Sequence, residues 1–127
     1  MNTVLVDTNI ILRFFLRDNE ILFASAKAIF NEAESGNAKI YIDELVVAEV
    51  IWTLTSFYKQ PKKEIANLLV KLVSRGWIVN PRKKLILKVL RLCSTINLSY
   101  VDCWLVEVAH KAKMPLRTFD KDLQKQV

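Results

Sequence analysis

The chain is short of the residues on which many common active sites depend. It has only two glycines, Gly36 and Gly76, among 127 residues. A P-loop and a GxGxxG dinucleotide turn both need several glycines within one short segment, so ATP- and NAD-dependent functions lose most of their support. With a single histidine, His110, the sequence gives no support to a two-histidine ribonuclease mechanism, to a Ser–His–Asp triad or to a Cys–His pair.

Cysteines and long apolar runs are also scarce. Cys93 and Cys103 fit no CxxC spacing, so we expect two reduced thiols packed as small hydrophobic residues. No apolar run reaches the roughly eighteen residues of a membrane helix, because Glu49 interrupts the longest one. The first residues, MNTVLVDTN, lack the basic and apolar regions of a secretory signal. The prediction is a cytoplasmic protein without a membrane segment.

The residues that are abundant suit a folded core. Hydrophobic residues make up 52% of the chain, which excludes a disordered protein. A chain of this length buries enough surface to fold without disulfides or a structural metal. No internal repeat, low-complexity tract or linker divides it. We therefore predict that residues 1–127 form a single domain.

Charge is unevenly distributed along the chain. The segment 59–91 has ten basic residues and one acidic residue, Glu64, so it carries +9 while the whole chain carries +6. Such a basic block is expected if a polyanion docks on it, and equally if it is a solvated face of two helices. The basic residues are Lys59, Lys62, Lys63, Lys71, Arg75, Arg82, Lys83, Lys84, Lys88 and Arg91.

Strand and helix patterns alternate from one end of the chain to the other. Short β-branched or apolar runs predict extended segments at 3–6, 39–42, 77–79 and 116–119. Helical spacing, with capping residues at the ends, predicts helices after Asp7, at 20–35, 44–58, 61–74, 82–96 and 100–113, and after Asp120. This alternation predicts an α/β fold with a mostly parallel central sheet and helices on both faces.

Two acidic residues each follow a predicted strand and open a helix. They are Asp7, in VLVDTN, and Asp120, in RTFDKDL. Ligands of parallel sheets gather beyond the carboxyl ends of strands, so both are candidate site residues, although either could simply cap a helix. Thr8 and Asn9 follow Asp7 and could orient ligands, and Thr118 could support Asp120 through a hydrogen bond.

Two further acidic residues interrupt apolar helices. Glu49 is the only acid in the middle of the most apolar helix, so we expect it to point into a cleft, although its stripe could also face water. Asp102 falls within the apolar arc of the helix from Tyr100, whereas Glu107 and His110 fall on the opposite, charged face. Asp102 could instead merely favour the helix dipole.

Four carboxylates folded into one pocket would repel each other unless a cation bound there. Ligation by oxygen alone favours Mg²⁺ or Mn²⁺ over zinc, which prefers Cys and His. Such ions can activate a water and stabilise the leaving oxygen of a phosphodiester. The hypothesis from the residues is therefore a metal site formed by Asp7, Glu49, Asp102 and Asp120.

The ordered set of segments resembles the PIN-domain ribonucleases, and most closely their VapC-type toxins. The segments are DTNIIL at 7–12, VVAEVIWTL at 46–54, YVDCWLVEVA at 100–109 and TFDKDL at 118–123. The resemblance covers essentially the whole chain; Cys103-Trp104 stands where small residues are common in the family. It implies a three-layer α/β/α sandwich around a mostly parallel sheet, usually dimeric.

The resemblance also implies an activity and a set of residues. Asp7, Glu49, Asp102 and Asp120 would be the metal-binding acids, supported by Thr8, Asn9 and Thr118. The family cleaves RNA with Mg²⁺ or Mn²⁺, typically leaving 5′-phosphate and 3′-hydroxyl ends. VapC-type members are silenced by an antitoxin protein whose tail occupies the active-site groove.

Two other classes of function remain open from the sequence. One is a non-catalytic RNA- or protein-binding module with the same fold, which the basic segment favours. The other is phosphoryl transfer through an aspartyl intermediate on Asp7, as in dehalogenase-like phosphatases. Those enzymes have a DxD motif at the first strand, whereas in this chain Asn9 stands in place of the second Asp.

Overall fold

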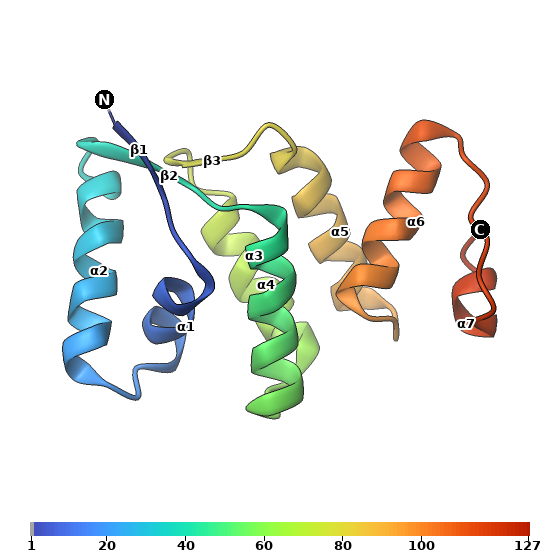
Figure 1. Ribbon diagram of the computed structural model, residues 1–127, viewed down its shortest axis with the longest axis horizontal. Coiled ribbons are helices and arrows are strands. Elements are labelled where there is room, and N and C mark those ends of the chain that lie inside the picture. Colours follow the sequence, from blue (N-terminus) through green and yellow to red (C-terminus); the bar gives the residue numbers. More distant parts are fainter. Residues whose placement is uncertain (1) are drawn as a thin grey trace.

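Figure 1 shows a computed structural model of the chain, which describes residues 2–127. Within this range, three parallel strands form one sheet in the order β1-β2-β3. The strands are β1 (Asn2–Leu5), β2 (Ala38–Tyr41) and β3 (Ile78–Val79). The helices are α1 (Thr8–Leu16), α2 (Glu20–Glu34), α3 (Glu44–Trp52), a π-helical turn η1 (Thr53–Phe57), α4 (Lys62–Val73), α5 (Lys83–Thr95), α6 (Tyr100–Ala112) and α7 (Lys121–Gln124). The predicted α/β fold with a parallel sheet is confirmed.

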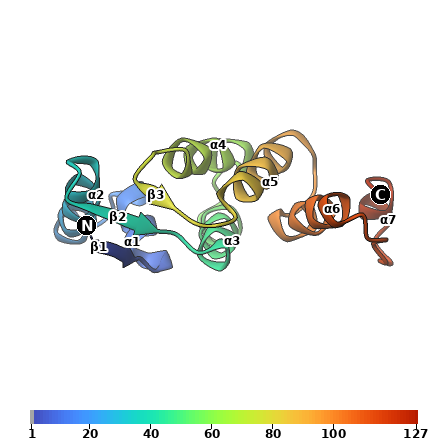
Figure 2. The same cartoon turned by 90° about the horizontal axis from the view of Figure 1, so that it is seen from above.

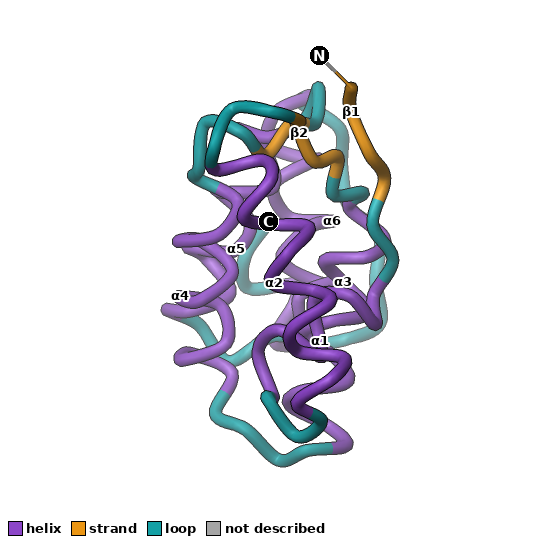
Figure 3. Tube along the Cα trace, turned by 90° about the vertical axis from the view of Figure 1, so that its left-hand side faces the viewer, coloured by secondary structure: helices purple, strands orange, loops and turns teal. Residues whose placement is uncertain are grey.

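The centre of the sheet is its most buried part. In the register of the strands, Val4 lies opposite Ile40, and Ile40 lies opposite Ile78. Ile40 and Ile78 are fully buried under the helices, whereas Val4 is 39% exposed. The sheet therefore loses cover toward β1, which is one of its two edge strands, and Figure 3 shows β1 running along the outside of the molecule.

Side-chain caps set most of the helix starts. The side chains of Asp7, Asn19, Asp43, Ser99 and Asp120 each accept a hydrogen bond from a backbone N–H in the first turn of the helix that follows. These short polar side chains satisfy N–H groups that a helix cannot satisfy internally. The caps at Asp7, Ser99 and Asp120 agree with the sequence prediction.

Two segments differ from the predicted elements. The helix expected over 44–58 changes at Thr53 into the π-helical turn, where the hydroxyl of Thr55 donates to the carbonyl of Ile51. The extended segment expected at 116–119 is not helical, but it joins no strand within residues 2–127. A strand needs a neighbour for its hydrogen bonds, and the sequence could not show where that neighbour would lie.

The elements follow one another along an elongated molecule. Figures 1 and 2 show β1, α1 and α2 at one end, α3 in the middle, and α6 and α7 at the other end. α3 contacts both α1 and α6. α4 and α5 pack along each other on the side of the molecule away from β1.

The side chain of Lys62 fixes the loop that leads into α6. Its Nζ donates to the carbonyl oxygens of Ile96, at 2.7 Å, and Leu98, at 2.6 Å. Because hydrogen bonds from charged groups contribute about 1.5–3 kcal/mol each, we expect Lys62→Met to lower the free energy of unfolding by about 2 kcal/mol. Exposed Lys63 offers the matched control, and Lys63→Met should change it by less than about 0.5 kcal/mol. Urea unfolding followed by circular dichroism measures both values, and equal values would contradict this role of Lys62.

Candidate metal centre

The side chains of Thr8 and Glu49 meet near the end of β1, and together with Asp7, which precedes Thr8 in the chain, we call them the N-terminal half-site. Asp7 lies two residues beyond β1 and caps α1, and Thr8 is the first residue of that helix. The Thr8 hydroxyl donates a hydrogen bond to Oε1 of Glu49, which lies on α3. This bond joins residues 41 positions apart in the sequence, so the fold places α3 beside the end of β1.

The cap leaves part of the Asp7 carboxylate free for another role. Its Oδ1 accepts the N–H of Ile10 at 3.2 Å. Within residues 2–127, no hydrogen bond engages Oδ2, and the side chain is exposed. Capping and ligation are therefore compatible at Asp7. Asn9, in the first turn of α1, is also exposed.

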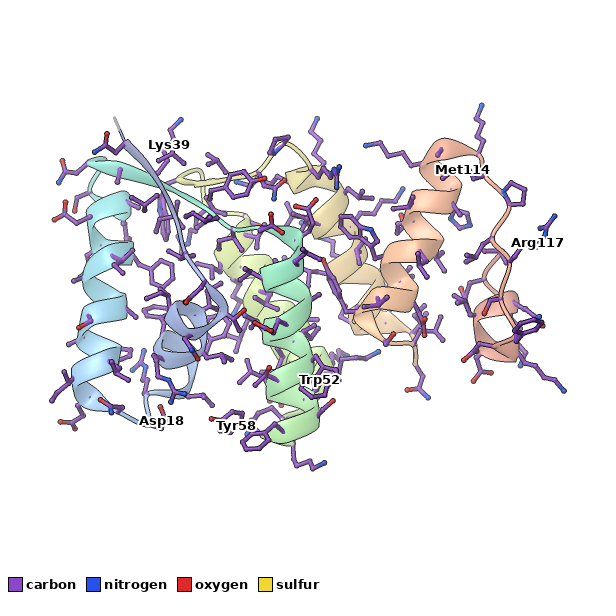
Figure 4. All side chains as sticks on the ribbon, in the orientation of Figure 1. Asp18, Lys39, Trp52, Tyr58, Met114 and Arg117 are labelled. Atoms are coloured by element: carbon purple, nitrogen blue, oxygen red, sulfur yellow. The ribbon has the colours of Figure 1, made fainter. Side chains whose placement is uncertain are left out.

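Glu49 lies on an exposed stripe of α3 rather than in a cleft. Leu45 and Trp52, four residues before it and three after it, are 77% and 65% exposed. Glu49 is exposed between them, and Figure 4 shows Trp52 pointing outward from the helix. We expected this apolar helix to be buried almost all round. Only its opposite face, with Val47, Val50 and Ile51, is buried.

Asp102 and Asp120 belong to the other end of the molecule, and we call them the C-terminal half-site. Asp102 is half-buried in the first turn of α6, where its N–H donates to the Ser99 hydroxyl at 3.1 Å. Asp120 is exposed, and its Oδ1 accepts the N–H of Leu123 at 2.9 Å. The Thr118 hydroxyl accepts the Asp120 N–H at 3.0 Å, so Thr118 holds the backbone at this position.

The orientation of α6 differs from the one predicted. Glu107, expected on a charged outer face, is buried against α5, with Lys88 Nζ 3.3 Å from its Oε2. Val101 and Leu105, expected in the buried arc, are exposed. The helix is apolar over so wide an arc that either side could pack inward, and packing on α5 decided which.

Two thiols lie within the contact between α5 and α6. Cys93 of α5 and Cys103 of α6 are fully buried. The hydrogen bond with the Cys93 thiol, together with burial, raises the pKa of Cys103. Burial likewise raises the pKa of the Tyr100 hydroxyl in the same contact. The Cys103 thiol and the Tyr100 hydroxyl therefore stay neutral, and both cysteines are free thiols packed as small buried residues, as the sequence predicted.

The two half-sites do not meet within one chain. Among residues 2–127, no three Asp, Glu, His or Cys side chains are grouped so that they could hold a metal ion. α3, which carries Glu49, stands between α1, which follows Asp7, and α6, which carries Asp102, and α7 lies farther away (Figures 1 and 2). The assembly of four carboxylates therefore stays a prediction.

The N-terminal half-site has the right donor chemistry for a hard cation. Asp7, Glu49 and Thr8 supply only oxygen atoms, and Mg²⁺ is commonly held by one or two carboxylates plus waters. Asp7 and Glu49 provide two carboxylates, whereas the predicted metal centre requires four. The oxygen donors fit Mg²⁺ or Mn²⁺, but the described residues do not bring together the four acids of the predicted metal centre.

The basic segment 59–91 is partly used by the fold itself. Lys83 donates to the carbonyl oxygens of Arg75 and Ile78, and burial lowers its pKa. Burial alone would raise the pKa of Glu44, but hydrogen bonds from Asn80 and Arg82 hold it below its usual value. Six basic residues of the segment remain exposed without an ion pair among the described residues: Lys59, Lys63, Lys71, Arg75, Lys84 and Arg91.

A comparison with protein-family models identifies the family. The PIN domain model matches residues 4–127, so the chain belongs to the PIN-domain family. PIN domains are generally metal-dependent nucleases. Searches of curated proteins and of solved structures give no match. No helix among residues 2–127 is long and apolar enough to span a membrane.

Proposed function

We propose that the protein is a metal-dependent endoribonuclease that hydrolyses RNA phosphodiester bonds. The observation that carries this proposal is the N-terminal half-site, in a chain of the PIN-domain family. Asp7 and Glu49 come from distant parts of the sequence, and Thr8 joins them at the carboxyl end of β1. Ligand sites of parallel sheets concentrate at that end of the strands.

The side chains of this half-site have distinct roles in the proposal. Asp7 and Glu49 supply negative oxygen ligands, and the Thr8 hydroxyl fixes the Glu49 carboxylate through its hydrogen bond. A bound Mg²⁺ or Mn²⁺ would activate a water and neutralise charge on the phosphodiester. Asn9, exposed beside Thr8, is placed to donate a hydrogen bond to a phosphate oxygen or a water.

RNA binding is proposed for the exposed basic residues of α4 and α5. Lys63, Lys71, Lys84 and Arg91 are exposed on these two helices. Contacts to phosphates hold a nucleic acid in place without reading its sequence. Figure 2 places these helices on the side of the molecule away from β1. An RNA that contacts these helices and also the N-terminal half-site must therefore follow the surface around the molecule.

The finer role proposed is that of the toxin in a toxin–antitoxin pair. This role would add an antitoxin protein as a partner and a homodimer as the working form. The protein would act in the cytoplasm, where the two free thiols of Cys93 and Cys103 stay reduced. The sequence resemblance to VapC-type proteins, given by the segments around the four acids, supports this role.

RNA cleavage tests the proposed function directly. We expect purified protein to cleave a structured RNA in the presence of Mg²⁺ or Mn²⁺ and to leave 5′-phosphate ends. EDTA should abolish cleavage, and added Mn²⁺ should restore it, because carboxylates without a metal cannot activate the water. End-group analysis of the products measures the outcome. Cleavage that persists in EDTA would mean that another nuclease is present.

A non-catalytic RNA-binding module is the second candidate. The separation of the two half-sites within one chain favours it, because the predicted four-acid centre is not assembled there. This candidate predicts RNA binding that does not depend on metal and weakens steeply with salt, without cleavage. A filter-binding titration at two salt concentrations, run beside the cleavage assay, separates the two functions.

A further inference from the structure

A pocket of about 420 Å³ lies between α3 and α6. Its walls are mostly apolar, with Leu45 and Ala48 of α3 facing Val101 and Trp104 of α6. A few charged groups line it as well, at the start of α3 and just before α5. A concave, mostly apolar surface on which a few polar groups converge is typical of a binding site for a small molecule or a part of a larger one.

The pocket adjoins residues that are proposed to hold the metal ion. Leu45 lies four residues before Glu49 on α3, and side chains at this spacing are neighbours on one face of a helix. On α6, Val101 comes directly before Asp102. A group that fills the pocket therefore lies about one helical turn, or about 5.4 Å, from Glu49. A phosphate at the metal and the base of the adjoining nucleotide are separated by a similar distance.

Aromatic side chains form one wall of the pocket. The ring of Trp104 lies 6.4 Å from the ring of Tyr100, at an angle of 30° to it. Tyr100 is buried and holds its place in the contact with α5, whereas Trp104 is only half-buried. The part of Trp104 that stays accessible lines the pocket. Bases of single-stranded nucleic acids stack on aromatic surfaces of this kind.

Asp43 supplies a half-buried carboxylate with room for further hydrogen bonds. Its Oδ1 accepts the N–H of Leu45 at 2.8 Å and so caps α3. Within residues 2–127, no hydrogen bond or ion pair engages its Oδ2. Glu44, beside it, is already occupied, because its two oxygens accept from Asn80 at 3.0 Å and from Arg82 at 2.6 Å. Asp43 is therefore the acid that can accept hydrogen bonds from a ligand.

A carboxylate selects among the RNA bases by their Watson–Crick edges. Guanine presents two adjacent donors there, N1–H and the N2 amino group, which match the two oxygens of a carboxylate. Adenine and cytosine each present one amino group beside a ring nitrogen that only accepts. Uracil presents a single N–H between two carbonyl oxygens. In these three bases an acceptor would face the carboxylate, so the pocket favours guanine.

We propose that the pocket between α3 and α6 binds a guanine base of the RNA substrate, next to the phosphodiester that is cleaved. The inference rests on the proposed function for the cleavage, whereas the binding of guanine stands by itself. The base stacks on Trp104, its Watson–Crick edge meets Asp43, and Arg82, whose side chain is 62% exposed, adds positive charge for a phosphate. Because cytosine occupies this edge in a duplex, the substrate is an unpaired strand or loop.

Binding of mononucleotides to the full chain tests the pocket without reading cleavage. 5′-GMP, 5′-IMP and 5′-UMP are titrated separately in EDTA, and the quenching of tryptophan fluorescence is followed. We expect 5′-GMP to bind about tenfold more tightly than 5′-IMP, which differs only in lacking the N2 amino group that would donate to Asp43. We expect 5′-UMP to bind more weakly than 5′-GMP as well.

Asp43→Asn tests the carboxylate itself. Asparagine also caps helices well, so the start of α3 should be kept. The amide replaces one acceptor by a donor, so we expect this variant to bind 5′-GMP about tenfold more weakly, at the level of 5′-IMP. Asp122→Asn, the same change at an exposed acid of α7, is the matched control and should leave the affinity unchanged.

The outcomes separate this pocket from the nuclease proposal. Equal affinity for 5′-GMP and 5′-IMP, or equal losses in Asp43→Asn and Asp122→Asn, would overturn the binding of guanine. The absence of quenching by all three nucleotides would overturn it too, and light scattering would then show whether a second copy covers the pocket. Selective binding of 5′-GMP without RNA cleavage would leave the pocket standing alone. Cleavage with no preference for guanine beside the cut would leave the nuclease proposal standing alone.

Discussion

Asp7→Asn and Asp120→Asn should each lower RNA cleavage by about a hundredfold or more, and an equal mixture of the two chains should stay inactive. Each substitution removes a negative oxygen ligand from the proposed metal centre. α3, which carries Glu49, contacts both α1 and α6 of its own chain, so we expect one chain to supply all the acids of a site. Every site of the mixture then carries one substitution. The initial rate of cleavage of a fluorescent RNA, after refolding the two chains together, measures the outcome.

A second mixture supplies the matched control for this experiment. Asp7→Asn and Glu49→Gln both fall in the N-terminal half-site, so every site of their mixture carries one substitution, whichever chain supplies the other acids. This mixture should stay inactive under the same refolding. Recovery in both mixtures would show that the substitutions only reduce activity, and recovery in the first mixture alone would show that two chains share a site. If neither mixture recovers activity while wild-type protein refolded in the same way is fully active, all four acids belong to a single chain.

The local elements of this fold were predictable because neighbouring residues determine them. Asp7, Ser99 and Asp120 could be recognised as helix caps, since a cap needs only a short polar side chain before an apolar period. The strand β2 could be recognised from its β-branched and aromatic residues. Pro61, expected in the first turn of a helix, is the cap residue immediately before α4. These features depend on a few consecutive residues.

Features that depend on distant packing were not predictable. Glu107 is buried and Val101 exposed because α6 packs on α5, a choice that its apolar pattern leaves open. Leu45 and Trp52 are exposed although their helix is apolar on nearly every side. The link from Thr8 to Glu49 joins two predicted site residues, but the place of Asp102 and Asp120 relative to them depends on how α6 packs against α3 and α5. No periodicity in one sequence contains that information.

Trp104→Leu should weaken the binding of 5′-GMP by about tenfold or more. The substitution keeps an apolar side chain on α6 but removes the aromatic surface that lines the pocket between α3 and α6. Stacking of a base on an aromatic side chain contributes about 1–3 kcal/mol, and about 1.4 kcal/mol corresponds to a tenfold change in the dissociation constant. Equilibrium dialysis of 5′-GMP against the protein in EDTA measures this constant without using tryptophan fluorescence.

The matched control for this variant is Trp52→Leu. Trp52 is 65% exposed on α3 and does not line the pocket, so the same replacement there should leave the binding of 5′-GMP unchanged. With a fluorescent RNA, Trp104→Leu should raise KM and leave kcat nearly unchanged, because a base held away from the reacting phosphate is bound equally in the ground state and the transition state. A lower kcat at unchanged KM, or equal losses of 5′-GMP binding in both variants, would show that no base stacks on Trp104.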